Sequence, residues 1–286
     1  VFLLLFLLFK FPVFSQNNKV IDSLNNELLK YKITKNRKED SIKVRTLLKL
    51  SFKNVFQDLP TSKKQVEQAL ELSKSKKLQK SFIDAVNIKG VYYIISGIQD
   101  SARYYFEKAL DLSKKKNFRD LETKCLNNLG MYHKNNGNLI KAQKYFIESL
   151  KLEEELGRSA SKSLSNIGLV YQELNQCEKA MAYHLRAKKI RDKEGDLFGL
   201  TVSLNNLAIC YKGLKDYENA ILNFLDCIEK CKEVGNLDTL YKVYQNLGNT
   251  YYLMNQYGKT LEYYKLSMNR DQKFPLSSQE KMILFE

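Results

Sequence analysis

A short motif recurs along this chain of 286 residues: Asn, then Leu or Ile, then Gly or Ala. Its copies are Asn128-Leu129-Gly130, Asn166-Ile167-Gly168, Asn206-Leu207-Ala208 and Asn246-Leu247-Gly248. The Gly or Ala positions are 38, 40 and 40 residues apart. A fixed period of this size indicates that one supersecondary unit is repeated and stacked, which constrains the fold more than any single residue could.

Aligning the copies on this Gly or Ala, and on Gly90 of an earlier copy, reveals further positions of constant character. Aromatic residues stand three residues later, at Tyr93, His133, Tyr171, Tyr211 and Tyr251, and again sixteen residues later, at Phe106, Phe146, His184, Phe224 and Tyr264. Small residues stand twelve residues later, at Ala102, Ala142, Ala180, Ala220 and Thr260, and nineteen residues later, at Ala109, Ser149, Ala187, Cys227 and Ser267. Bulky and small residues at helical spacing predict two closely packed helices in each repeat.

The expected helix ends carry residues that tolerate a left-handed backbone. The turn inside each repeat falls at Gly97, Gly137, Asn175, Lys215 and Asn255, and the second helix ends near Asn117, Gly157, Gly195 or Gly235, with Pro275 at that place in the last copy. A single helical pair of this kind cannot bury its apolar face alone. We therefore expect an all-α fold in which consecutive pairs stack.

These positions resemble the tetratricopeptide repeat, in a form of about 40 residues, although the chain has no Trp and lacks the usual Pro after the second helix. The resemblance covers five copies, at 83–122, 123–160, 161–200, 201–240 and 241–276. It implies a right-handed α-solenoid of stacked antiparallel helix pairs, the tetratricopeptide superhelix. We expect a degenerate repeat at 43–82, an amino-terminal capping helix at 16–42 and the start of a further repeat at 277–286.

Residues 2–9 form an apolar run that ends before Lys10, and such a run is too short to cross a bilayer as a helix. Val13 and Ser15 suit a signal-peptidase site, which predicts a signal peptide at 1–15 and a mature start at Gln16. The alternative is a buried first helix. The first interpretation predicts an exported protein, periplasmic or extracytoplasmic.

The formal charge of +15 is concentrated at the amino-terminal end, where residues 1–81 carry 17 Lys and Arg against 7 Asp and Glu. An acidic partner, a membrane surface or nucleic acid could exploit it. We favour a solvated lysine-rich surface, and we expect no nucleic-acid partner because few of these lysines alternate with aromatic residues.

No catalytic pattern stands out. The chain lacks a phosphate-binding loop, an HExxH motif, a paired CxxC and a GxSxG turn. Its five cysteines include Cys227 and Cys231, one helical turn apart, but we interpret them as small buried residues. The run Glu153-Glu154-Glu155 is interpreted as a solvated face. We therefore expect no enzyme activity, no metal site and no cofactor.

The candidate binding residues follow from the resemblance, because the first helices of tetratricopeptide stacks line the concave surface. The position just before the Leu commonly faces that groove, which gives Asn128, Asn166, Asn206 and Asn246. Neighbouring lysines are Lys124, Lys162, Lys242, Lys134 and Lys212. An amide can pair with the backbone of an extended peptide, and lysines favour carboxylates. The alternative, that these asparagines are only repeat consensus on a solvated helix face, stays open.

We expect a non-enzymatic scaffold that binds a protein or extended peptide, with acidic ligands favoured. The plan also resembles the exported repeat regions of bacterial sensor proteins. The second hypothesis is therefore the sensory half of a receptor, such as a histidine kinase or transcriptional regulator, whose output domain lies beyond Glu286.

Overall fold

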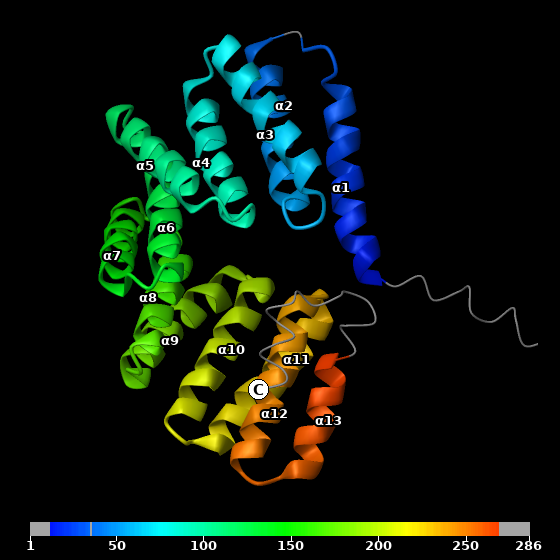
Figure 1. Ribbon diagram of the computed structural model, residues 1–286, viewed down its shortest axis with the longest axis vertical. Helices are drawn as coiled ribbons and strands as arrows, with labels where there is room; N and C mark the ends of the chain where they lie inside the picture. Colours follow the sequence, from blue (N-terminus) through cyan, green and yellow to red (C-terminus); the bar gives the residue numbers. More distant parts are fainter. Residues whose placement is uncertain (1–11, 35, 269–286) are drawn as a thin grey trace, which may run out of the picture. The chain divides into compact units, whose positions relative to one another are not determined.

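The computed structural model describes residues 12–34 and 36–268, which form thirteen helices and contain no β-strand (Figure 1). In chain order they are α1 (Pro12–Lys30), α2 (Arg37–Asn54), α3 (Leu59–Ser75), α4 (Gln79–Ile95), α5 (Gln99–Lys115), α6 (Arg119–Asn135), α7 (Leu139–Glu155), α8 (Ser161–Glu173), α9 (Cys177–Glu194), α10 (Leu197–Gly213), α11 (Tyr217–Val234), α12 (Leu237–Leu253) and α13 (Tyr257–Met268).

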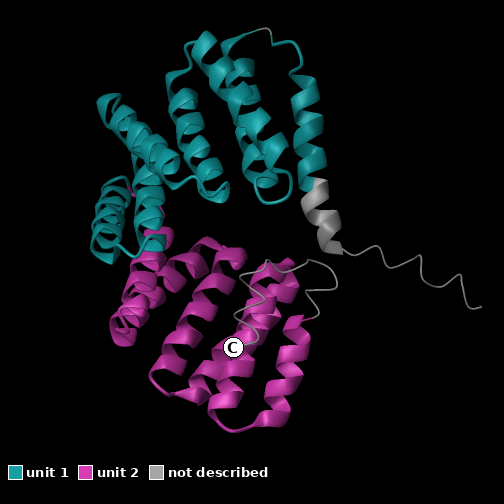
Figure 2. Ribbon diagram, in the orientation of Figure 1, with its two compact units in different colours: residues 1–156 teal, residues 157–286 magenta. Residues whose placement is uncertain are grey.

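The chain divides into two units, residues 1–156 and 157–286 (Figure 2). In the first unit α2 packs on α3, α4 on α5 and α6 on α7; in the second, α8 packs on α9, α10 on α11 and α12 on α13. The first helices of neighbouring pairs also touch, as α4 touches α2 and α6, and α10 touches α8 and α12. The expected fold class, an all-α solenoid of stacked antiparallel helix pairs, is confirmed.

The helix ends predicted from Gly and Asn are confirmed by the backbone. Every one of these positions within the described residues has a positive φ, from 53° at Asn117 to 76° at Gly97. The turn after α4 is an example of how these helices end. The backbone N–H of Ile98 donates to the carbonyl of Tyr93 at 2.9 Å, and this hydrogen bond closes the last turn of the helix. Lys77 adopts the same conformation after α3 (φ 52°), as Lys215 does after α10 (φ 62°), and it stands 40 residues before Asn117, at the same place in the repeat.

The core follows the predicted columns of small and bulky residues. The alanines at 102, 142, 180 and 220 are completely buried, as are Phe146, His184 and Phe224. An ideal Cβ atom placed on Gly130 would lie 2.4 Å from the ring of Phe146, and one on Gly168 would lie 2.4 Å from the ring of His184. A very small residue, Gly in most copies and Ala208 in one, therefore suits this position because the aromatic residue of the second helix rests directly on the backbone of the first.

The amino-terminal region differs from the expected single capping helix at 16–42. α1 ends at Lys30 and α2 begins at Arg37, so these residues are divided between two helices. Asn36 starts α2: its Oδ1 accepts from the backbone N–H of Glu39, and its Nδ2 donates to the Glu39 carboxylate, both at 3.0 Å. This is a reciprocal cap of the Asn-x-x-Glu kind. The Asn-x-x-Glu spacing that marks this break, Asn36 to Glu39, is present in the sequence.

Most of the observed helix pairs do not begin at the repeat boundaries that were expected from the sequence. α4, α6, α10 and α12 each begin four residues before the boundary drawn from the sequence, and α2 and α3 form a complete pair in the region of the degenerate repeat. The further repeat at 277–286, Pro275 and residues 1–11 of the expected signal peptide lie outside the described residues. Within the part of the chain that is described, none of the helices has the length and apolar character needed to cross a bilayer.

Candidate peptide-binding surface

The asparagine column lies along the seam between neighbouring first helices. In the first unit, Nδ2 of Asn128 on α6 donates to Oδ1 of Asn87 on α4 at 3.0 Å. In the second unit, Nδ2 of Asn246 on α12 donates to Oδ1 of Asn205 on α10 at 3.1 Å. Both pairs join residues 41 positions apart in sequence, so the bond repeats with the fold. Asn128 and Asn246 are both half-buried.

The other two asparagines of the column are buried, with Asn166 only 7% exposed on α8 and Asn206 only 5% exposed on α10. The backbone carbonyl of Asn206 accepts a hydrogen bond from Nε2 of Gln172 on α8 at 3.0 Å. Among the described residues, Nδ2 of Asn206 has no hydrogen-bond partner. The geometry of these two residues favours a role in helix packing, and contact of the column with a peptide stays a prediction.

The candidate lysines differ in their surroundings. Lys124 on α6 is exposed and forms an ion pair with Asp84 on α4 at 3.5 Å, beside a second pair between the same helices, Lys80 with Asp120 at 2.7 Å. Lys162 and Lys242 are exposed on α8 and α12, whereas Lys134 and Lys212 are half-buried. Burial lowers the pKa of the Lys212 ammonium below its ordinary value.

Apolar side chains accompany the polar ones on the same helices. In four of the five copies the residue that directly follows the Gly or Ala is apolar and half-buried: Val91 and Met131 in the first unit, Leu169 and Ile209 in the second. In the fifth copy Asn249 stands at this position. We use the name first-helix face, within each unit, for these apolar residues together with the half-buried asparagines and the exposed lysines of the first helices. Sequence reasoning named the polar members of this face and missed the apolar ones, although they occupy a constant position beside the motif.

Stacked aromatic pairs join the first helix to the second helix in four of the helix pairs: α4–α5, α6–α7, α8–α9 and α12–α13. Tyr93 stacks on Tyr105, His133 on Tyr145, Tyr171 on Tyr183 and Tyr251 on Tyr263, with ring centroids 5.3 to 5.5 Å apart. The first members were predicted as a column. Their partners stand fifteen residues after the Gly, a second column that went unnoticed because Asn223 interrupts it. The stacking explains the tyrosines as packing residues.

The cysteines and the acidic run were also placed by the structure. Four cysteines are buried and Cys177 is half-buried, and burial raises the pKa of the Cys125 and Cys210 thiols to about 12. The interpretation of Glu153 as part of a solvated face was wrong, since this side chain is buried and its Oε1 lies 3.5 Å from Nδ2 of Asn127. Asn127 also donates to Oγ of Ser149 at 2.7 Å, so a polar cluster draws Glu153 inward.

The amide seam leads to a prediction for Asn205 and Asn246. Replacing either with Ala is expected to cost about 1 kcal/mol of stability, and the double variant should cost less than the two single losses added together, by about 0.5 to 1 kcal/mol, because both remove the same hydrogen bond. Urea denaturation of the four proteins measures this coupling. Strictly additive losses would mean that the bond contributes nothing to the stack.

Sequence models of the tetratricopeptide repeat family match residues 122–193, and again 202–229 and 241–274. No curated protein sequence matches the chain significantly. The fold and the first-helix faces define a protein of the helical-repeat class, one that presents an extended surface on stacked helix pairs. More particularly, the chain is a tetratricopeptide repeat protein. Repeats of this family serve as protein-interaction modules and are generally not catalytic.

Solved structures of similar fold have little sequence in common with the chain. A Rap protein complexed with Competence and Sporulation Factor has a TM-score of 0.70 and 18% identity, over 91% of this chain and 72% of that one. Aspartyl phosphate phosphatase F from Bacillus subtilis has a TM-score of 0.67 and 17% identity, over 90% and 68%. A signal-transduction ATPase with a tetratricopeptide repeat sensor, from Pyrococcus horikoshii, has a TM-score of 0.66 and 14% identity, over 94% of this chain and 42% of that one. At these identities the likeness shows the fold alone.

Proposed function

We propose that this protein is a non-enzymatic scaffold that holds an extended segment of a partner protein against a first-helix face. The observation that carries the proposal is the composition of that face. On α6 the face combines half-buried Asn128 and Met131 with exposed Lys124. In the second unit its members are shared among the first helices: half-buried Leu169 and Ile209, exposed Lys162 and Lys242, and half-buried Asn246. A ligand that spans neighbouring first helices of one unit would therefore meet amide, apolar and basic groups along the same face.

Each kind of group has a separate role in this proposal. The exposed part of Asn246 can pair with the backbone of an extended chain, since its Nδ2 already donates to Asn205 while its Oδ1 can still accept. Leu169 and Ile209 supply apolar surface, and Lys162 and Lys242 attract carboxylates. Each contact is weak, and affinity arises from adding several contacts along a surface that is already formed before binding.

The similar structures are consistent with such a role. One of them, a Rap protein, was solved in complex with Competence and Sporulation Factor, so this fold can hold a bound factor. The proposal for the present chain rests on its own surface residues.

The proposal is tested with a displayed library of random seven-residue peptides selected on the full chain. We expect the enriched peptides to bind the double variant Lys162→Glu/Lys242→Glu at least about tenfold more weakly, because two favourable charges become repulsive. The matched control is Lys193→Glu/Lys232→Glu, which makes the same charge change at exposed positions of second helices. Fluorescence anisotropy gives the dissociation constants. Equal losses in both double variants would refute binding at the first-helix face.

A second candidate function is the sensory half of a signalling receptor. The similar structure from Pyrococcus horikoshii belongs to a signal-transduction ATPase in which tetratricopeptide repeats form the sensor, which favours this alternative. It requires an output domain beyond Glu286, so reading the gene downstream decides it. A stop codon soon after a capping helix would exclude it, and about 20 apolar residues followed by a further domain would support it.

The proposed location is outside the cytoplasm, after cleavage of residues 1–15. Expression in a bacterial host followed by amino-terminal sequencing tests this proposal. Protein recovered from the periplasm with Gln16 as its first residue is the expected result, and retention of the apolar run in the cytoplasm would contradict it.

A further inference from the structure

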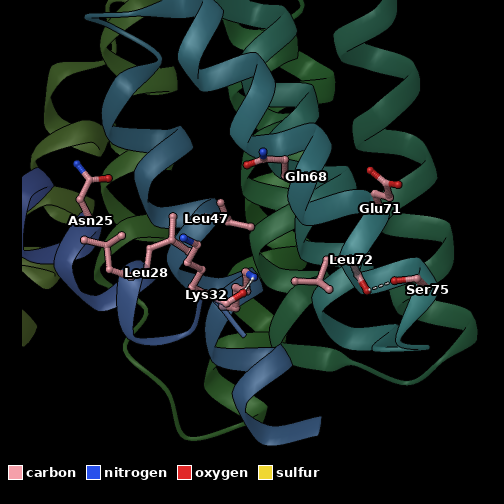
Figure 3. Close-up of a pocket in the computed structure, with 10 residues that line it drawn as sticks. Asn25, Leu28, Lys32, Leu47, Gln68, Glu71, Leu72 and Ser75 are labelled. Carbon is pink, nitrogen blue, oxygen red and sulfur yellow. Dashed lines mark hydrogen bonds between the residues drawn. The ribbon is translucent and has the colours of Figure 1, made fainter. Parts of the chain in front are cut away.

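A groove lies between α1 and α3 at the amino-terminal end of the first unit, with α2 as its floor (Figure 3). Its volume is about 710 Å³. Leu28 of α1, Leu47 of α2 and Leu72 of α3 form an apolar band across it, and Leu29, which is 67% exposed, extends the band on the α1 side. This set of residues is separate from the first-helix faces.

The groove exists because α1 does not pack on α2 as the later helices pack on each other. Forty residues after Lys43, the corresponding position of α4 holds Ile83, which is only 2% exposed in the core. The charged side chain of Lys43 cannot serve as a buried apolar core residue in this way. Instead its Nζ donates to the backbone carbonyl of Lys32 at 3.0 Å, and Thr46 donates to the Glu27 carboxylate at 3.1 Å. Leu28 of α1 packs against the core of α2 and α3, and these two polar bonds hold α1 to α2 beside it.

The two ends of the groove differ chemically. In Figure 3, Asn25 and Gln68 lie toward one end, and Lys32 and Ser75 toward the other, with the leucines between them. The hydrogen bond from Lys43 to the Lys32 carbonyl places a second ammonium group at the Lys32 end. One acidic group, Glu71 of α3, also lines the groove, so the two lysines leave it with an excess of positive charge.

The dimensions limit what the groove can hold. Gln68 and Ser75 are seven residues apart on α3, a distance of about 10 Å along the helix axis. At about 3.3 Å per residue, this length matches about three residues of an extended chain. A volume of about 710 Å³ is in the range of pockets that bury most of a small ligand.

We propose that this groove binds a short extended segment of a partner protein in which one or two leucine-like side chains are followed by an acidic residue. The apolar side chains occupy the leucine band. The carboxylate lies between the ammonium groups of Lys32 and Lys43, where charge complementarity orients the segment. The amides of Asn25 and Gln68 pair with its backbone at the opposite end.

The test measures binding of one unlabelled peptide, acetyl-Ala-Leu-Leu-Glu-Ala-amide, to the full chain by isothermal titration calorimetry. Capping both ends removes the terminal charges, so the Glu side chain is the only carboxylate of the sequence. Two further probes replace Glu with Gln, or both Leu with Ser. We expect saturable binding of the first peptide and at least about tenfold weaker binding of the other two.

Variants of the chain locate the binding. Lys32→Glu and Leu29→Ser are each expected to lower the affinity for the first peptide at least about tenfold. The matched controls are Lys30→Glu and Ile33→Ser, because Lys30 and Ile33 are exposed neighbours that do not line this groove, and each should change the affinity less than about twofold. Leu29 and Ile33 are both largely exposed, so neither serine variant should unfold the helix pair.

Three outcomes would overturn the proposal: no saturation up to about 1 mM peptide, equal loss in variants and controls, or equal affinity for the Glu and Gln peptides. The double variant Lys162→Glu/Lys242→Glu distinguishes this site from the first-helix face. If it alone abolishes binding of the peptide, the ligand binds the first-helix face and the groove is not its site.

Discussion

Replacing Gly130 with Val is expected to lower the free energy of unfolding by about 3 kcal/mol, near the upper end of what overpacking costs in a well-filled core. A Cβ atom at this position meets the Phe146 ring at 2.4, 2.6 and 2.8 Å, and Phe146 is completely buried. The ring cannot move aside without losing its own contacts. Val adds two further methyl groups to that Cβ atom, and its small gain in helix propensity over Gly, about a few tenths of a kcal/mol, does not offset the overpacking.

The controls for this prediction are Gly258→Ala and Gly130→Ala. A Cβ atom at Gly258 on α13 meets nothing within 4 Å, so this change should alter stability by less than about 0.5 kcal/mol. Gly130→Ala should cost less than Val, since Ala208 occupies the same column and lies in one core cluster with Phe224. Urea denaturation followed by circular dichroism gives the three values. A stable Val variant would show that the α6–α7 contact is looser than the structure indicates.

Replacing His184 with Phe is expected to stabilise the protein by about 1 to 2 kcal/mol at pH 7, because it removes two desolvated polar atoms from the core. His184 is completely buried, and within the described part of the chain neither of its ring nitrogens has a hydrogen-bond partner. Other repeats show that Phe fits at this position: the ring of Phe106 rests on Gly90 as His184 rests on Gly168.

The same residue makes stability depend on pH. Burial, with a smaller contribution from the charge of Arg191, lowers the pKa of His184 from 6.5 to about 4. Between these pH values the unfolded chain therefore binds a proton at His184 that the folded chain does not bind. The part of the unfolding free energy that depends on a neutral His184 is fully present above pH 6.5 and is lost as the pH falls toward 4. The loss approaches about 3 kcal/mol in full.

The measurement compares the unfolding free energies of the wild type and His184→Phe between pH 7.5 and pH 4.5. The gap between the two proteins should widen by about 2 kcal/mol as the pH falls through this window. A gap that stays constant would show that His184 acquires its proton in the folded state without penalty, for instance from water admitted to the core.

The repeat period alone was enough to predict the helix pairs, their turns and most of the core. These features depend on local preferences, such as the positive φ at Gly97 and Asn255, and on spacing that brings Gly and the aromatic residue together in every copy. Where the copies diverge from each other the prediction failed. The region 16–42 has no repeat pattern, so only the cap at Asn36 could have revealed the break between α1 and α2.

At the candidate site, some features follow from the sequence and others only from the tertiary structure. The sequence by itself determined which residues recur on the first helices, since recurrence is a property of spacing. Only the tertiary structure decided that Asn128 and Asn246 bond to the neighbouring helix, that Asn166 and Asn206 are buried, and that Lys43 leaves a groove beside α1. These outcomes depend on which side chain of one repeat meets which side chain of the next. The asparagine pairs join residues 41 positions apart and the Lys43–Lys32 bond joins residues 11 apart, and in neither case does the residue type at one position specify its partner.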